Sequence, residues 1–357
     1  MSLPRLPLVG QSLGDYRVEA YLDGGQFGDV YRATHEPSGT AVALKVLDPN
    51  ASVEQIREFD NEAELLVKLS GATAVVNLLD TQSAPYTLIP PGPGIPFHLT
   101  LRFHVLELAQ DNLATVVALR AAVPWSDRLA LFRGVVLGAH QMHLKNIAHR
   151  DLKSSNCLLY QRRFNVLEAK VADLGRSRDL TQPSLASAHL YAMPRGDPAF
   201  APPELIWGLG TDTPEQHLRS DLYLLGSILF ELATGQGITA MVLLPRLSIF
   251  FSDLAMPPPI RAARFSGRLL EIRSWYESEY SLLYSELPPC LRHPTVELLR
   301  QLCDPDPVRR LPRVARGRRA SVPPGLLWLI ARVDILRKLL YKSEIEAAHL
   351  ASRKVAR

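Results

Sequence analysis

Three reactive groups lie at short spacing between residues 149 and 156: the carboxylate of Asp151, the ammonium of Lys153 and the carboxamide of Asn156. A tight loop that leads into the apolar run 157–160 would aim these groups at one small volume. Phosphoryl transfer needs such a set, because a carboxylate takes the acceptor's proton, a cation offsets the moving charge, and an amide oxygen holds a metal ion. The alternative is a solvated turn after a helix, capped by Asn156.

A second set of groups lies earlier, where three strand-like runs between residues 16 and 46 predict an antiparallel sheet. Gly24, Gly25 and Gly28 separate the first two runs and would let the backbone approach phosphate oxygens. Taken alone, these glycines are explained equally well by a plain turn. Lys45, one strand later, adds a cation that makes the phosphate interpretation stronger.

These motifs resemble those of the eukaryotic-type (Hanks-type) serine/threonine protein kinases. Residues 149–156 match the catalytic loop His-Arg-Asp-Leu-x-x-x-Asn, and residues 42–45 resemble the strand Val-Ala-Ile-Lys. Asp173-Leu174-Gly175 resembles the Asp-Phe-Gly motif, with leucine in place of phenylalanine. The motifs occur in the family's order, and the resemblance covers roughly residues 16–312.

The resemblance implies an α+β, two-lobed protein kinase-like fold. We expect an N-terminal extension over residues 1–15 that lies across the first sheet, a small β-rich lobe with one helix over 16–107 and a larger helical lobe over 108–312. A basic tail with a helix is expected over 313–357. The proline- and glycine-rich segment 83–96 is expected to be an insertion between two strands.

By resemblance, the chain binds ATP with Mg²⁺ or Mn²⁺, and Asn156 and Asp173 are the metal ligands. The implied catalytic residues are Asp151, Lys153, Lys45 and Glu62. Asp151 would face the acceptor hydroxyl, and Lys45 would hold the α- and β-phosphates.

Two acids on a helix expected from Val53 to Leu69 compete to pair with Lys45. Glu62 shares the inward face of the helix's leucines, whereas Glu64 lies four residues before Lys68 and suits a solvated pair. Glu62 is therefore the expected partner.

The adenine edge would meet backbone groups of a hinge over residues 107–109, with Leu106 as gatekeeper and Asp111 near the ribose. The apolar slot residues would serve equally as ordinary core when no ligand is bound. The nucleotide-binding residues implied by the resemblance are Leu22, Gly24, Gly25, Gly28, Val30, Ala43, Lys45, Leu106, Glu107, Ala109, Asp111 and Leu158.

Residues 175–204 resemble an activation segment. Its hydroxyls Thr181, Ser184, Ser187 and Tyr191 are candidates for phosphorylation, and Arg150 would be the natural partner of such a phosphate.

Two further resemblances are structural. Arg310 is expected to pair with Glu204 at the end of the segment, and Asp221 is expected to hold the backbone of the catalytic loop.

Two residues depart from the family. Asp23 replaces the first loop glycine, and Asp197 replaces a threonine beside the catalytic aspartate and lysine.

Composition limits the class of protein. The 357 residues carry a net charge of +4, and 47% are hydrophobic, which is typical of a globular chain. Specific nucleic-acid binding is not expected. Three scattered cysteines, and no apolar stretch long enough to span a bilayer, predict a soluble cytoplasmic protein.

The tail has a basic run (Arg313, Arg316, Arg318 and Arg319) and then leucines at helical spacing. A helix packed on the kinase body is favoured; the alternative is a basic amphipathic element that meets an acidic partner or a membrane surface.

The sequence thus predicts a kinase that phosphorylates Ser/Thr hydroxyls of protein substrates, because Lys153 resembles the serine/threonine branch. One rival is a pseudokinase scaffold that binds nucleotide weakly, which only Asp23 and Asp197 support. The other is a small-molecule phosphotransferase, which the elements at Glu204, Asp221 and Arg310 argue against.

Overall fold

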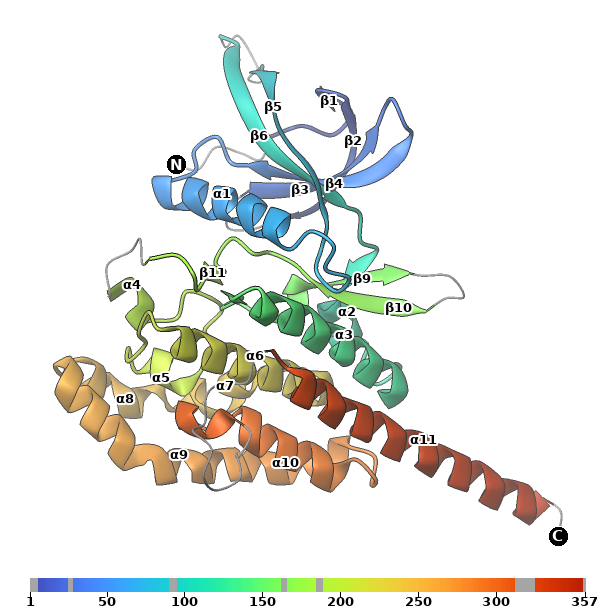
Figure 1. Cartoon of the computed structure of the whole chain (residues 1–357), viewed down its shortest axis with the longest axis vertical. Coiled ribbons are helices and arrows are strands. Elements are labelled where there is room, and N and C mark those ends of the chain that lie inside the picture. The colour runs from blue at the N-terminus through green and yellow to red at the C-terminus, as the bar shows by residue number, and fades with distance from the viewer. Residues whose placement is uncertain are drawn as a thin grey trace. The chain divides into compact units, whose positions relative to one another are not determined.

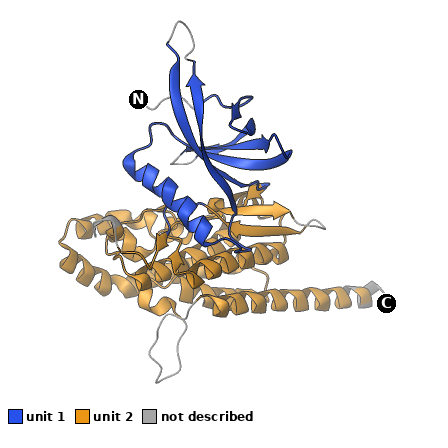
Figure 2. Cartoon of the chain, turned by 45° about the horizontal axis from the view of Figure 1, so that its top comes forward, with its two compact units in different colours: residues 1–110, 173–177 blue, residues 111–172, 178–357 orange. Residues whose placement is uncertain are grey.

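The computed structural model describes residues 6–24, 28–89, 95–161, 166–183, 189–311 and 325–355. The chain divides into two compact units, drawn in different colours in Figure 2. Unit 1 comprises residues 1–110 and 173–177, and unit 2 comprises residues 111–172 and 178–357. Unit 1 is built mainly of strands and unit 2 mainly of helices, which confirms the α+β prediction.

Unit 1 contains a six-stranded antiparallel sheet with strand order β1-β2-β3-β4-β6-β5 (Figure 1). Its strands are β1 (Ser12–Leu13), β2 (Tyr16–Gly24), β3 (Gly28–His35), β4 (Thr40–Leu47), β5 (Leu78–Leu88) and β6 (Phe97–Glu107). In β2, buried Tyr16 and Val18 alternate with exposed Arg17 and Glu19, as expected where one face of a sheet is covered. The three strands expected between residues 16 and 46 are β2, β3 and β4.

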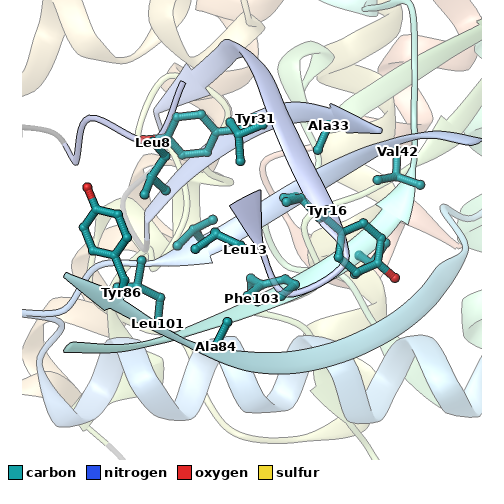
Figure 3. Close-up of a cluster of buried hydrophobic side chains, with 14 residues drawn as sticks. Leu8, Leu13, Tyr16, Tyr31, Ala33, Val42, Ala84, Tyr86, Leu101 and Phe103 are labelled. Atoms are coloured by element: carbon teal, nitrogen blue, oxygen red, sulfur yellow. The ribbon is translucent and has the colours of Figure 1, made fainter. Parts of the chain in front are cut away.

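The segment before β2 belongs to the core of unit 1. Leu8 and Leu13 are fully buried and join Tyr31 of β3 and Phe103 of β6 in one apolar cluster (Figure 3). Two backbone hydrogen bonds to Val18 fix this segment against β2. Burying each leucine stabilises the fold by roughly 1.5–3 kcal/mol, so residues 6–13 are more than an extension.

Helix α1 (Val53–Lys68) begins at a capping box. Ser52 Oγ accepts from the Gln55 backbone N–H at 3.3 Å, and the Gln55 side chain accepts from the Ser52 N–H at 2.8 Å. The helix buries Phe59 and Glu62, while Glu64 is exposed. The inward face predicted from the leucine spacing is therefore correct.

The prediction of an insertion over residues 83–96 is wrong in its first part. Strand β5 continues to Leu88, and Pro85 is paired with Thr100 of β6. Proline is tolerated there because β5 is an edge strand, where the missing N–H needs no partner. Residues 90–94 lie outside the described part of the chain.

Unit 2 contains most of the helices. The longer ones are α3 (Trp125–Leu144), α6 (Pro214–Thr234), α9 (Pro258–Glu286), α10 (Arg292–Leu302) and α11 (Leu327–Val355). The shorter ones are α2 (Leu113–Ala118), α4 (His189–Ala192), α5 (Pro203–Ile206), α7 (Ile238–Val242) and α8 (Leu247–Leu254). Its short strands are β7 (Asp111–Asn112), β8 (Ile147–Ala148), β9 (Cys157–Gln161), β10 (Leu167–Val171) and β11 (Arg178–Asp179), in sheets β10-β9-β7 and β11-β8.

Helix α6 is buried over most of its length, as the nearly apolar sequence from Leu222 to Leu232 predicts. Thr213 caps its N-terminus, and Gly235 ends it in the left-handed conformation at φ 90°. Within the described ranges, no single helix meets the length and hydropathy expected of a membrane span; α6 and the segment Ile238–Leu254 meet them only together, across a 74° bend.

The tail helix α11 packs on α3 within unit 2. Its buried side chains repeat at helical spacing, and they are Leu329, Ile330, Val333, Leu336 and Leu340. At its start, the Leu326 N–H donates to His140 Nδ1 at 2.8 Å, and Arg133 Nε lies 2.7 Å from Asp334 Oδ1. The favoured interpretation of the tail as a packed helix is thus confirmed, whereas the basic run 313–319 lies outside the described residues.

Candidate active site

The side chains of Lys45, Glu62 and Asp173 meet within unit 1. Lys45 lies on β4, where its register partner on β6 is His104, and its Nζ is 2.5 Å from Glu62 Oε2. The same Nζ is 2.9 Å from Asp173 Oδ1. Lys45 is 8% exposed and Glu62 is 1% exposed, so the pair is held away from solvent. The pairing expected from the helix face is therefore observed.

The charges in this cluster depend on one another. Burial disfavours the Lys45 ammonium, but Asp173 and Glu62 outweigh that effect and raise the pKa of Lys45 above its ordinary value. Burial raises the pKa of Glu62, with Lys45 acting in the opposite direction and Asp173 in the same one. Lys45 is therefore a permanent cation that two carboxylates hold in a fixed position.

Glu62 also connects the cluster to the start of the activation segment. Its Oε1 accepts from the Leu174 N–H at 3.3 Å, and Leu174 is fully buried. The residue just before it on α1, Asn61, donates from Nδ2 to the carbonyls of Gly175 at 2.9 Å and Ser177 at 3.0 Å. Leucine thus keeps the apolar contact expected of phenylalanine in this motif.

The glycine-rich turn is described at both of its ends. A Cβ on Gly28 would lie 1.9 Å from the Val46 carbonyl oxygen, so only glycine allows β3 to start this close to β4. Asp23 is exposed, and its Oδ1 accepts from the N–H of Gly24 at 2.8 Å. Asp23, which departs from the family motif, therefore makes a hydrogen bond within its own turn. Gly25 lies outside the described residues.

The expected nucleotide slot is split between the two units. In unit 1, Ala43 and Leu106 are buried and form a register pair between β4 and β6. Val30, Glu107 and Ala109 are half-buried in the same unit, and Leu22 is 47% exposed. In unit 2, Leu158 is half-buried, and Asp111 is exposed and accepts from Thr115 Oγ1 at 2.7 Å.

The catalytic loop of unit 2 is held by Asp221 from α6. This fully buried carboxylate accepts the backbone N–H groups of His149 and Arg150 at 2.8 Å each, and His143 Nε2 lies 2.9 Å away. Burial disfavours its charge, but these donors lower the pKa of Asp221 below its ordinary value. Arg150 can then adopt a strained left-handed φ of 70°, which turns the chain into Asp151. Asp221 has the structural role expected of it.

The groups of the first motif converge within unit 2. Asn156 Nδ2 donates to the Asp151 carbonyl at 2.8 Å, which leaves its Oδ1 as the oxygen that can bind a metal. The Asp197 N–H donates to Asp151 Oδ1 at 3.1 Å, and Asp197 Oδ2 lies 4.0 Å from Lys153 Nζ. A Cβ on Gly196 would lie 2.4 Å from the same Asp151 oxygen, so glycine permits this contact.

The end of the activation segment is fixed by a buried ion pair. Arg310 donates to both carboxylate oxygens of Glu204, at 2.7 and 2.6 Å, and neither side chain is more than 4% exposed. The pairing expected between these residues is therefore observed.

Sequence reasoning missed another ion pair in unit 2, between Arg178 of β11 and Asp212. Arg178 donates from Nε and Nη2 to the two oxygens of Asp212, at 3.3 Å each. His217 Nε2 lies 2.7 Å from the same carboxylate. The spacing of these three residues carries no periodic signal, so only the fold brings them together.

The comparisons with known proteins agree with this geometry. The protein kinase domain family matches residues 16–312. Serine/threonine-protein kinase Pkn1 of Myxococcus xanthus is 31% identical over 239 residues, which cover 64% of this chain and 30% of that protein. Serine/threonine-protein kinase ATG1a of Arabidopsis thaliana is 30% identical over 230 residues, covering 63% of this chain and 32% of that protein. This chain therefore spans about a third of the length of these curated relatives, and it belongs to the protein kinase family.

Proposed function

We propose that this chain is an ATP-dependent protein serine/threonine kinase. The observation that carries the proposal is the Lys45–Glu62–Asp173 cluster in unit 1. A fold that served only as a scaffold has no need of a buried cation at 2.5 and 2.9 Å from two carboxylates, since each buried charge is costly unless it is paired. The names of the similar kinases support the choice of Ser/Thr acceptors.

The two departures from the family give little support to a scaffold. Asp23 is engaged with its own turn, and its side chain lies on the exposed part of β2. Asp197 still binds the catalytic carboxylate, through its backbone N–H. The departure at position 197 therefore keeps a backbone contact to the residue expected to accept the proton.

The metal-ligand chemistry of the chain fits Mg²⁺. Asp173 offers a carboxylate whose side chain is 33% exposed, and Asn156 offers an amide oxygen. We propose that these two residues hold the ion, which when bound would neutralise charge on the phosphate oxygens of ATP. Lys45 would bind the α- and β-phosphates from its position between the two carboxylates.

The remaining steps fall to unit 2. Asp151 would accept the proton of the acceptor hydroxyl, because Asp197 and Gly196 keep one of its oxygens in a fixed place. Lys153 would offset negative charge on the transferred phosphoryl. Its ammonium lies 4.0 Å from Asp197, so that carboxylate restrains it.

The test is incorporation of labelled phosphate from ATP into generic proteins rich in Ser and Thr, with Mg²⁺ or Mn²⁺, beside nucleotide affinity measured by calorimetry. Asp151→Asn should bind ATP like the wild type yet transfer phosphate about a hundredfold more slowly. If the wild-type chain binds ATP but transfers nothing with any metal or acceptor, the proposal is wrong and the scaffold alternative stands.

We also propose a cytoplasmic location, which the three free cysteines support. For the basic run 313–319 we propose contact with an acidic partner or a membrane surface. Co-sedimentation with anionic and neutral vesicles, and titration with an acidic polypeptide, would detect either; no binding to any of them contradicts this proposal.

A further inference from the structure

A group of basic side chains lies beside the catalytic loop in unit 2. Arg150, Arg195 and His217 line one pocket together with Asp151 and Tyr191. The Arg150 guanidinium lies over the Tyr191 ring at 5.0 Å. Burial and, after it, the neighbouring Arg195 lower the pKa of Arg150 to about 10. A nearby negative charge would stabilise these two guanidinium groups.

Asp212 supplies that charge from inside the fold. Arg178 donates to both of its oxygens at 3.3 Å, and His217 Nε2 lies 2.7 Å from Oδ1. The side chains are 14% exposed for Arg178, 12% for Asp212 and 6% for His217. Asp212 is linked to Arg150 through His217, which lines the same pocket as Arg150 and contacts the Asp212 carboxylate; that carboxylate favours the Arg150 charge. Because these side chains have little access to water, losing one partner of the ion pair should cost more than losing one partner of an exposed pair.

The two partners come from different parts of the chain. Arg178 belongs to β11, inside the activation segment, whereas Asp212 lies beyond Glu204, where the segment ends. Strand β11 pairs with β8 (Ile147–Ala148), which leads directly into the catalytic loop. The strand pairing therefore attaches the first part of the activation segment to the strand that leads into Asp151, and the ion pair fixes the same part of the segment to Asp212.

We propose that Asp212 is a positioning residue that acts as a built-in counter-charge for Arg150 and Arg178, so that phosphoryl transfer does not require phosphorylation of the activation segment. The proposal rests on the proposed kinase function. In this chain, the negative charge that a phosphorylated hydroxyl would bring to Arg150 is already provided by a carboxylate. Tyr191, one of the candidate hydroxyl residues, is itself buried against Arg150.

The test is Asp212→Asn, which keeps the shape of the side chain and removes its charge. Transfer should fall by about tenfold or more, and added inorganic phosphate should restore it, because the anion can replace the missing charge. Chloride at equal ionic strength should not. The matched control is Asp304→Asn. Asp304 also accepts from an arginine, Arg273, at 2.9 Å, and its side chain is only 15% exposed. Neither residue lines the pocket beside the catalytic loop. Phosphate should not change the activity of this control.

A second readout does not depend on activity. Phosphate should raise the unfolding temperature of Asp212→Asn more than that of the wild type or Asp304→Asn. A wild-type chain that transfers nothing would contradict the proposed function alone, and this thermal comparison would still decide the role of Asp212. If Asp212→Asn does not fold, Arg178→Met, which removes the other partner, is measured in the same way; it should lose transfer without rescue by phosphate.

A third measurement addresses phosphorylation directly. A variant with alanine at Thr181, Ser184 and Ser187 should transfer phosphate at the wild-type rate. A large loss in this variant overturns the inference. So does an Asp212→Asn variant with wild-type activity, or one that is folded and inactive but gains neither activity nor thermal stability from phosphate.

Discussion

Replacing Lys45 by methionine should reduce both stability and activity, for separable reasons. The change removes the cation between Glu62 and Asp173. The Asp173 side chain is 33% exposed and can recover water, whereas the Glu62 side chain is 2% exposed and cannot. One uncompensated buried carboxylate therefore remains. Breaking a buried pair in this way costs about 3–5 kcal/mol of unfolding free energy.

The cost should depend on pH, because Glu62 can escape it by binding a proton. Burial already raises the pKa of Glu62, and the variant loses the Lys45 charge that opposes this. A carboxyl group whose pKa is higher in the folded state favours folding at low pH, and this contribution disappears as the pH rises through the folded pKa. The destabilisation by Lys45→Met should therefore be small in acid and largest above neutrality.

The assay is urea unfolding of wild type and variant at about pH 5.5 and about pH 8. The control is the double variant Lys45→Met/Glu62→Gln, which carries no buried charge at this place and should recover most of the stability at the higher pH. It should still transfer phosphate on the order of a hundredfold more slowly than wild type, because the phosphate-binding cation is gone. A single variant as stable as wild type at both pH values would refute the reasoning.

Three further outcomes are expected. Asp173→Asn should raise the Mg²⁺ concentration needed for half-maximal transfer; an unchanged titration curve would remove Asp173 from the metal site. Arg310→Met should lower the unfolding free energy by about 3–5 kcal/mol, and adding Glu204→Gln should restore much of it; equal stability of the single and double variants would contradict a buried pair. Burial, opposed by the hydrogen bond from Ser154, raises the pKa of Glu231 to about 7. The unfolding free energy of the wild type should therefore fall relative to that of Glu231→Gln as the pH rises from about 5 to about 7, by up to about 1.4 kcal/mol per pH unit. Denaturant unfolding of both proteins across that range tests this, and a difference in stability that does not change with pH would contradict it.

Ordered motifs that resemble a known family were enough to predict the fold class, and together with local pattern they predicted several of the pairs at the site. The inward face of α1 identified Glu62 because a helical period is visible in sequence. Asp221 and the partners Glu204 and Arg310 were reached through ordered motifs. In each case, the signal lay in a short, periodic or well-marked stretch of chain.

The features that sequence did not predict depend on contacts between distant segments. Residues 1–15 were expected to lie across the first sheet, but the full burial of Leu8 and Leu13 in its core follows only from the strands against which they pack. Pro85 argues against a strand unless that strand is known to be an edge. The attachment of Arg178 to Asp212 joins two irregular segments, for which no periodicity exists to be read.

The contact between α11 and α3 shows that the end of the family match is not the end of the packed structure. The family match ends at residue 312, but α3, the helix that precedes the catalytic loop, is covered by side chains that follow residue 325. A chain cut at the family boundary would expose an apolar stripe on α3 and leave His140 without the N–H of Leu326. The family match and the packed structure therefore end at different residues in this protein, and the packed structure is the longer one.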